Sequence, residues 1–250
     1  MSWPALSIRD LRREPWAQVR LQRDRPVSRP LSQLRAEDLS GVYPAREGAN
    51  YKGRLPTSGA YWSSTMSDLV FYESRLERET LIVADFDADV VEIIAQPFRM
   101  RAVVDGKARM HTPDYALLRS GGLIEIVNCK PRAYLSDPKV IALHAWVGAA
   151  LGQAGIRHRV ASELPAARRA NLESLAHLRN PRWSSGLPLD VVAAAAADPI
   201  SIGDLTYLLR REVAGPTVKL TLRALLWHGV LETDLDELLS SKSVVQVRSA

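Results

Sequence analysis

The segment Leu123–Cys129 is the feature that most restricts how this chain can fold. Apolar residues fill both its odd and its even positions, and a glycine pair precedes it. A short strand that is apolar on both faces is typical of the buried centre of a sheet with helices packed on either side. The sequence therefore predicts an α/β domain in which this segment is a central strand.

Signals on both sides of this strand predict the order helix, strands, helix, strand. A helix with Ser67 as its N-cap is predicted to run to about Asp85, from apolar residues at helical spacing. Asp105-Gly106 predicts the turn of a β-hairpin. The remaining elements are predicted as strands over 90–96, 98–104, 107–110, 114–118 and 157–161 and a helix over 137–151. This is a mixed α/β core with helices on both faces.

The 250 residues divide by composition into three predicted parts. Residues 1–64 are rich in Arg, Pro and Gly, and we expect a basic, extended arm with one short helix around Leu31–Leu39. Residues 65–164 form the α/β domain. Residues 165–250 read as helices over 165–179, 201–211 and 217–228, followed by a strand or wing over 230–235. That outline is typical of a helical, winged-helix-like module.

Composition and charge narrow the classes of protein that are possible. Apolar residues make up 46% and charged residues 24% of the chain, as in soluble globular proteins. The single cysteine, Cys129, rules out an intrachain disulfide and fits a reducing cytosol, so a cytoplasmic location is expected. No apolar run is long enough to span a bilayer, so no membrane partner is expected. The net charge of +5 arises within residues 1–60, which favours either attraction to phosphate or a solvated tail.

Two short motifs suggest a metal-dependent phosphodiesterase site. Pro113-Asp114 precedes the central strand, and Lys130 ends that strand two residues after Asn128. A carboxylate such as Asp114 holds Mg²⁺, which offsets charge on the scissile phosphate. Because strand side chains alternate, Lys130 shares a face with Asn128, and its ammonium is placed to hold and polarise the attacking water. Each residue also has a plain structural use, Asp114 in a turn and Lys130 at a strand end.

Further carboxylates are available, and one departure weakens the predicted metal site. Asn128 stands where this nuclease class usually has a carboxylate, and its amide oxygen ligates Mg²⁺ without adding charge. Glu125 is the nearest acidic residue on the strand, but on a regular strand it points to the opposite face. Glu73 and Glu77, expected one turn apart on the first helix, are candidates for the second carboxylate. The other interpretation of this pair is a solvated Glu/Arg surface.

Taken together, five motifs in order resemble the TnsA-type endonuclease subunit of heteromeric bacterial transposases. These subunits belong to the restriction-endonuclease-like PD-(D/E)xK superfamily. The resemblance covers about residues 51–164 and rests on the segments Phe71–Glu79, Phe86-Asp87, Gln96–Phe98, Thr112–Tyr115 and Asn128–Pro131. It implies a restriction-endonuclease-like mixed-sheet nuclease core followed by a winged-helix-like domain.

The resemblance also implies site residues, a cofactor and partners. It matches Glu73, Asp114 and Lys130 to catalytic positions, and Glu73, Asp114, Asn128 and the main-chain carbonyl of Cys129 to ligands of Mg²⁺, for which Mn²⁺ would substitute. The position of Asn128 is often Gln in the family, so Asn is one methylene shorter. The implied activity is cleavage of the non-transferred strand at transposon ends for cut-and-paste transposition, and the implied partners are a recombinase subunit and an ATP-dependent regulator.

Two other functions are compatible with the sequence. One is a stand-alone restriction or repair nuclease, which would need its own DNA specificity. The other is a catalytically weak or inactive DNA-binding or adaptor protein of a transposition complex, with Asn128 marking a decayed site. The sequence leaves open whether residues 165–250 bind DNA or protein, although the acidic residues Glu232, Asp234, Asp236 and Glu237 favour protein.

Overall fold

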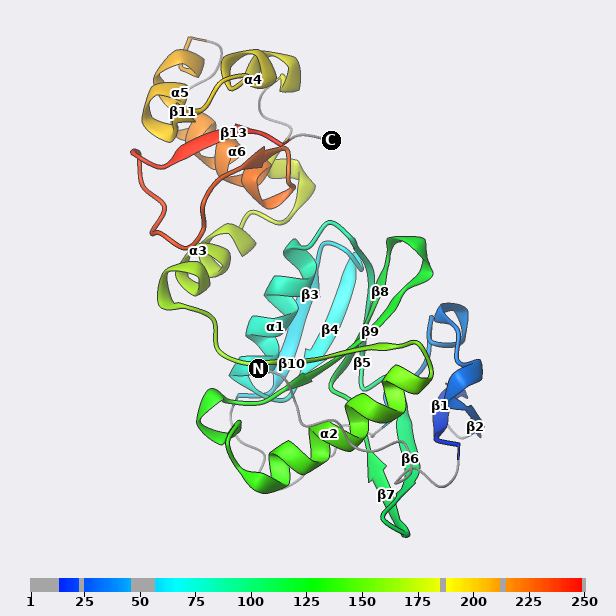
Figure 1. Cartoon of the computed structure of the whole chain (residues 1–250). Helices are drawn as coiled ribbons and strands as arrows, with labels where there is room; N and C mark the ends of the chain where they lie inside the picture. The colour runs from blue at the N-terminus through cyan, green and yellow to red at the C-terminus, as the bar shows by residue number, and fades with distance from the viewer. Residues whose placement is uncertain (1–13, 23–24, 46–56, 185–187, 212–214, 249–250) are drawn as a thin grey trace. The chain divides into compact units, whose positions relative to one another are not determined.

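The computed structural model in Figure 1 describes residues 14–22, 25–45, 57–184, 188–211 and 215–248. These residues fall into two compact units. The first contains the described residues up to Ala84 together with Asp89–Glu163, and the second contains Asp85–Ala88 and the described residues after Glu163. Helices together with sheets, one of which contains a parallel pair, confirm the expected α/β class. Among the described residues, none of the helices has the length and apolarity needed to cross a membrane.

The first unit is built on a four-stranded sheet in the order β10-β9-β8-β5. Its strands are β5 (Val90–Ala95), β8 (Tyr115–Arg119), β9 (Ile124–Cys129) and β10 (Arg157–Ala161). Strand β9 pairs antiparallel with β8 and parallel with β10. All of its residues except Cys129 are buried, so the predicted central buried strand is confirmed.

Alternating residues of β9 face two different helices, α1 (Arg75–Phe86) and α2 (Pro138–Gln153). Ile124 and Ile126 belong to the core cluster that also contains Trp146 and Val147 of α2. Cys129 has the opposite parity, and its Sγ lies 3.2 Å from Thr80 Oγ1 on α1. The side chain of an even-numbered residue such as Asn128 therefore belongs to the α2 face.

A second sheet, in the order β2-β1-β6-β7, corrects the expectation of an extended N-terminal arm. Its strands are β1 (Trp16–Gln22), β2 (Arg25–Pro30), β6 (Arg99–Val104) and β7 (Lys107–His111). The Asp105-Gly106 hairpin is confirmed, with both residues at positive φ. Instead of a helix around Leu31–Leu39 there are two 3-10 turns, η2 (Leu31–Gln33) and η3 (Ala36–Asp38). The parts of the predicted arm at 1–13 and 46–56 lie outside the described residues.

The predicted start of the first helix at Ser67 is wrong. Residues Asp68–Tyr72 form β4, which pairs with β3 (Gly59–Ser63), and Ser67 has a φ of 50° in the turn between them. Helix α1 begins after Ser74 instead. Ser74 Oγ accepts a hydrogen bond from Glu77 N at 3.1 Å, and the Glu77 carboxylate accepts one from Glu73 N at 2.7 Å. This capping arrangement fixes where the helix starts.

The second unit, described by itself, consists of helices and a small sheet. The helices are α3 (Ala166–Ala176), α4 (Leu189–Ala195), α5 (Ile202–Leu209) and α6 (Gly215–Trp227), with a 3-10 turn, η6 (Pro181–Trp183), between α3 and α4. The sheet has the order β11-β13-β12, from β11 (Ile200–Ser201), β12 (Leu231–Glu232) and β13 (Val244–Val247). The sequence did not predict α4. The helix predicted from residue 201 is present as α5, and Ser201 is its N-cap, since its side chain accepts a hydrogen bond from Asp204 N.

Candidate active site

Asp114 lies just before β8 and is tied to the end of β9. Its Oδ2 accepts a hydrogen bond from the backbone N–H of Cys129 at 2.7 Å, and its carbonyl accepts one from Gln96 N at 2.8 Å. The carboxylate is half-buried. These bonds hold the Pro-Asp aspartate beside the strand that carries Lys130.

Glu77, in the first turn of α1, lies within electrostatic range of both Asp114 and Glu73. Burial raises the pKa of Glu77, and the nearby charges of Asp114 and Glu73 raise it further. Hydrogen bonds from Glu73 N and Ser74 Oγ act against this rise in the pKa. The structure therefore gathers three acidic side chains on the α1 side of β9. Glu73 precedes α1 rather than lying on it, which corrects the predicted helical position.

The same side of the sheet carries Tyr115, Thr80 and the Cys129 side chain. The Tyr115 hydroxyl donates to the Phe71 carbonyl at 3.1 Å, and burial raises its pKa, with Glu77 as the next cause. Burial also raises the pKa of the Cys129 thiol, with a further contribution from Asp114. Cys129 is therefore a neutral thiol at physiological pH. A thiolate is the form that attacks or binds metals, so we expect its side chain to be inert.

Asn128 lies on the α2 side, within a group of histidines that the sequence did not predict. Its Nδ2 is 2.9 Å from His111 Nε2, and its Oδ1 is 3.1 Å from His158 Nε2. The His158 ring stacks on His144, with ring centroids 5.7 Å apart. Asn128 is 2% exposed. A metal ion bound by the amide oxygen would therefore compete with His158 for it.

Lys130 follows β9, where its backbone joins it to the end of β10. Its N–H donates to the Ala161 carbonyl at 2.9 Å, and its own carbonyl accepts from Ser162 Oγ at 2.7 Å. Its ammonium is close enough to His144 to contribute to the lowered pKa of that imidazole. The main chain of Lys130 is therefore fixed at the end of the sheet, and its side chain is half-buried.

The contacts of Glu125 indicate a structural role rather than a role in catalysis. Its carboxylate accepts from Arg119 at 2.8 Å and from Arg159 at 2.9 Å. Burial opposes its ionisation, but these two guanidinium groups lower its pKa overall. The prediction that Glu125 points away from Asn128 is confirmed, since it pairs with two arginines while Asn128 contacts histidines.

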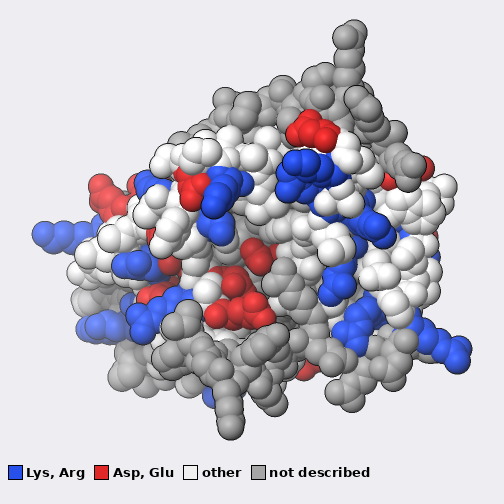
Figure 2. Space-filling model, turned by 90° about the horizontal axis from the view of Figure 1, so that it is seen from below, with Lys and Arg blue, Asp and Glu red and all other residues white. Residues whose placement is uncertain are grey.

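The predicted site residues therefore form two groups on either side of β9. Glu73, Asp114 and Cys129 lie with Glu77 on the α1 side, whereas Asn128 lies with the histidines and Lys130 acts electrostatically on that second group. Within the described ranges, no three His, Cys, Asp or Glu side chains are arranged to hold a metal ion. Figure 2 shows a face on which acidic side chains gather near the centre, with Lys and Arg side chains around them.

The chemistry of the acidic group fits a hard divalent cation. Carboxylate oxygens are the ligands that Mg²⁺ prefers, and a cation beside Asp114 would offset the like charges that raise the pKa of Glu77. Asp114, Glu73 and the Cys129 carbonyl are the groups that would hold the cation. The sequence indicated Glu77 only as an alternative source of the second carboxylate. The buried amide of Asn128 fits this role less well.

No protein-family model matches the chain, and no curated protein is significantly similar to it. The assignment of its function therefore depends on the residues and their geometry.

Proposed function

We propose that this protein is a Mg²⁺-dependent DNA endonuclease subunit of a heteromeric transposase, similar to the TnsA type. The observation that carries the proposal is the hydrogen bond from Cys129 N to Asp114 Oδ2, at 2.7 Å. It holds the Pro-Asp carboxylate against the end of β9, which Lys130 follows, and Glu73 and Glu77 supply further negative charge nearby. This combination is typical of restriction-endonuclease-like sites.

The order of elements supports the same proposal. Apart from the β6-β7 hairpin, which follows β5 and belongs to the other sheet, helix α1 is followed by β5, β8 and β9, then by α2 and β10, with the parallel pair at β9 and β10. This agrees with the helix, three strands, helix, strand order of a restriction-endonuclease-like core. In the second unit, the order α4, β11, α5, α6, β12, β13 agrees with a winged-helix-like module.

The proposed roles of Asp114 and Glu73 follow from their place in the acidic group, whereas that of Lys130 follows from the resemblance, since its ammonium acts on the histidine group. A bound Mg²⁺ supplies charge stabilisation of the phosphate and a more acidic water. Asp114 would hold the cation, and Glu73 would supply the second carboxylate. Lys130 would orient the attacking water and stabilise the hydroxide by its positive charge. The cut would fall on the non-transferred strand, while a recombinase subunit cuts the other strand and an ATP-dependent regulator contacts the complex.

A second function is favoured by one specific observation. The Asn128 amide is held between His111 and His158, which would leave the site short of one ligand. A catalytically inactive adaptor in a transposition complex is consistent with that arrangement. The two functions differ in what they predict for Lys130, because an adaptor does not need an ammonium at the end of β9.

We expect Lys130→Met to lower the rate of cleavage by about a hundredfold or more, because a positioned proton-handling group contributes that much. The measurement is strand-resolved cleavage of a transposon-end duplex in Mg²⁺, with the recombinase subunit that the proposal requires. The control is Lys139→Met, an exposed lysine on α2. Equal rates for the wild type and Lys130→Met, in complexes that assemble equally well, would favour the adaptor. A cut that needs no recombinase would favour a stand-alone nuclease.

A further inference from the structure

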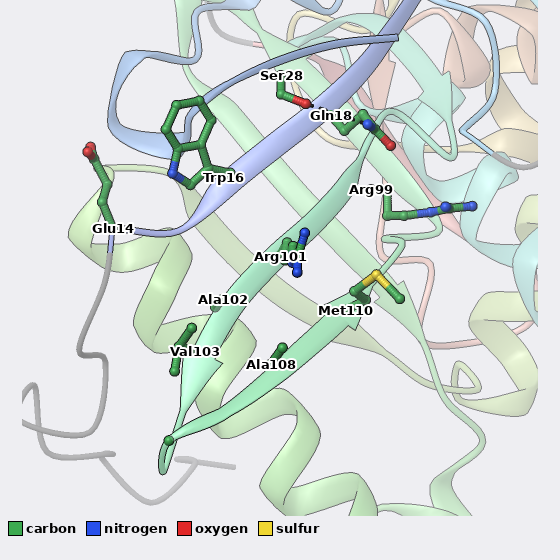
Figure 3. A pocket seen from close by; sticks show the side chains of 11 residues that line it. Glu14, Trp16, Gln18, Ser28, Arg99, Arg101, Ala102, Val103, Ala108 and Met110 are labelled. Atoms are coloured by element: carbon green, nitrogen blue, oxygen red, sulfur yellow. Dashed lines mark hydrogen bonds between the residues drawn. The ribbon is translucent and has the colours of Figure 1, made fainter.

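The outward face of the β2-β1-β6-β7 sheet bears a pocket that the proposed active site does not use (Figure 3). It has a volume of about 840 Å³, and its walls come from all four strands of this sheet. Open pockets of roughly 300–1,000 Å³ are the usual size for small-molecule ligands. The pocket is therefore large enough to take a nucleotide unit.

Strand register places an aromatic, a cationic and a sulfur-containing side chain in one row. Trp16 of β1 pairs with Arg101 of β6, and Arg101 pairs with Met110 of β7. A parallel row pairs Gln18 with Arg99. Trp16 is 45% exposed and Met110 is 66% exposed, so the row presents apolar surface to solvent on both sides of a guanidinium. Figure 3 shows these side chains on three adjacent strands.

The charge of this sheet has a single sign. Its four strands contain seven Lys and Arg residues and no Asp or Glu. Arg29, Lys107 and Arg109 pair with the buried Ala17, Val104 and Ala102 and so belong to the inner face, whereas Arg99 and Arg101 share the outward face with Trp16. Within the described part of the chain, neither Arg99 nor Arg101 forms an ion pair. Glu14 is the acidic residue at the rim of the pocket, and its carboxylate accepts a hydrogen bond from Ser32. The face is therefore complementary to a polyanion.

We propose that this face, defined by Trp16, Gln18, Arg99, Arg101 and Met110, binds single-stranded DNA. An unpaired base would stack on the Trp16 indole, Met110 would offer apolar surface on the far side of Arg101, and the flanking phosphates would meet Arg99 and Arg101. Aromatic side chains interleaved with arginines on a sheet are the arrangement that binds single strands without reading sequence. A duplex offers phosphates but no free base face, so it would leave Trp16 and Met110 without a partner. The choice of DNA over RNA rests on the proposed function.

Binding of a fluorescein-labelled oligo(dT) 12-mer, measured by fluorescence anisotropy with the full chain in EDTA, tests this proposal. EDTA prevents cleavage, so a failure of the proposed nuclease activity does not affect the result. We expect Trp16→Ala to weaken binding about tenfold, since stacking contributes strongly for each base. Trp16→Phe should stay near the wild type because a flat ring remains. Arg99→Gln combined with Arg101→Gln should lower the slope of log affinity against log salt by about 1.4, from two phosphates at roughly 0.7 each.

Matched controls separate this face from the rest of the first unit. Leu69→Ala removes an exposed apolar side chain from β4, and Arg157→Gln removes an exposed arginine from β10. Both should bind oligo(dT) like the wild type. Equal affinity of Trp16→Ala and the wild type would overturn the proposal. An equal loss of single-strand and duplex binding in Trp16→Ala would overturn it as well. So would a change in the oligomeric state of Trp16→Ala on size exclusion with DNA affinity intact, because the face would then be a protein interface.

Discussion

Replacement of Asp114 by Asn is expected to reduce DNA cleavage on the order of a thousandfold, because it removes the charge that holds the cation while keeping the shape of the side chain. The amide oxygen of the substituted side chain can still accept the hydrogen bond that Cys129 N donates to Asp114 Oδ2. The fold should therefore survive better than in an alanine variant. The measurement is the single-turnover rate in Mg²⁺ with the complex assembled, alongside the thermal midpoint of the variant.

Asp137→Asn provides the matched control for this prediction. Asp137 also accepts a hydrogen bond from a backbone N–H, that of Lys139 at 2.8 Å, but it caps α2 and lies outside the acidic group. Its variant should cleave at the wild-type rate with a similar small change in stability. If Asp114→Asn and Asp137→Asn cleave equally fast, the carboxylate of Asp114 has only a structural role.

The histidines around Asn128 should make the stability of the first unit depend strongly on pH below neutrality. Burial lowers the pKa of His144 to about 4, with His158 as the next cause, and burial lowers the pKa of His158 to about 4 as well. In the unfolded chain both would titrate at about 6.5. Between these values the unfolded state binds more protons than the folded state, so stability is complete above about pH 6.5 and is lost as the pH falls towards 4.

The size of this effect is expected to be about 3 kcal/mol or more for the pair between pH 7 and pH 4.5. Urea unfolding followed by circular dichroism at each pH measures it. His144→Leu should flatten the dependence by removing one of the two groups. His177→Gln is the control, since His177 is exposed on the surface of the second unit. A His144→Leu profile that runs parallel to the wild type would show that the buried imidazoles do not cause the acid sensitivity.

The sequence predicted the elements whose conformation depends on residues close to them in the chain. The Asp105-Gly106 turn requires two positive φ values, and the observed angles are 51° and 75°. Asp137 and Ser201 accept hydrogen bonds from the first turns of α2 and α5, as N-caps do. The consecutive apolar residues of β9 predicted its burial between two helices, because only a central strand can hide both faces.

Elements that depend on distant partners were not predicted. The β1 and β2 strands contain prolines and arginines, and they are strands because β1 pairs with β6, which lies far along the chain. The segment after Ser67 has apolar spacing that fits a helix, but Ser67 at positive φ turns it back to pair with β3. In both cases pairing with a distant strand decides the conformation, and the local sequence pattern carries no information about that pairing.

The candidate site was predicted only in part, because some of its residues come together through contacts between distant parts of the chain. The Pro-Asp and strand-end lysine motifs located Asp114 and Lys130 correctly at the ends of neighbouring strands. The alternation rule also placed Asn128 away from Glu125. The histidines around Asn128 come from β7, α2 and β10, so no local spacing brings His111, His144 and His158 together. One signal indicated that Asn128 faces α2. It follows Ile124 and Ile126 at every second position along the strand, so its side chain lies on the same face of the sheet as theirs, and that face packs against α2.

Binding of Mn²⁺ to the protein on transposon-end DNA, followed by electron paramagnetic resonance, tests the proposed metal site without relying on cleavage. Mn²⁺ replaces Mg²⁺ in oxygen-ligand sites and can be counted. We predict that the wild-type complex binds Mn²⁺ that Mg²⁺ displaces, that Asp114→Asn loses this Mn²⁺, and that Asp137→Asn retains it. Equal Mn²⁺ binding by the wild type and Asp114→Asn would contradict the proposal, because the metal would then have no dependence on the carboxylate that defines the site.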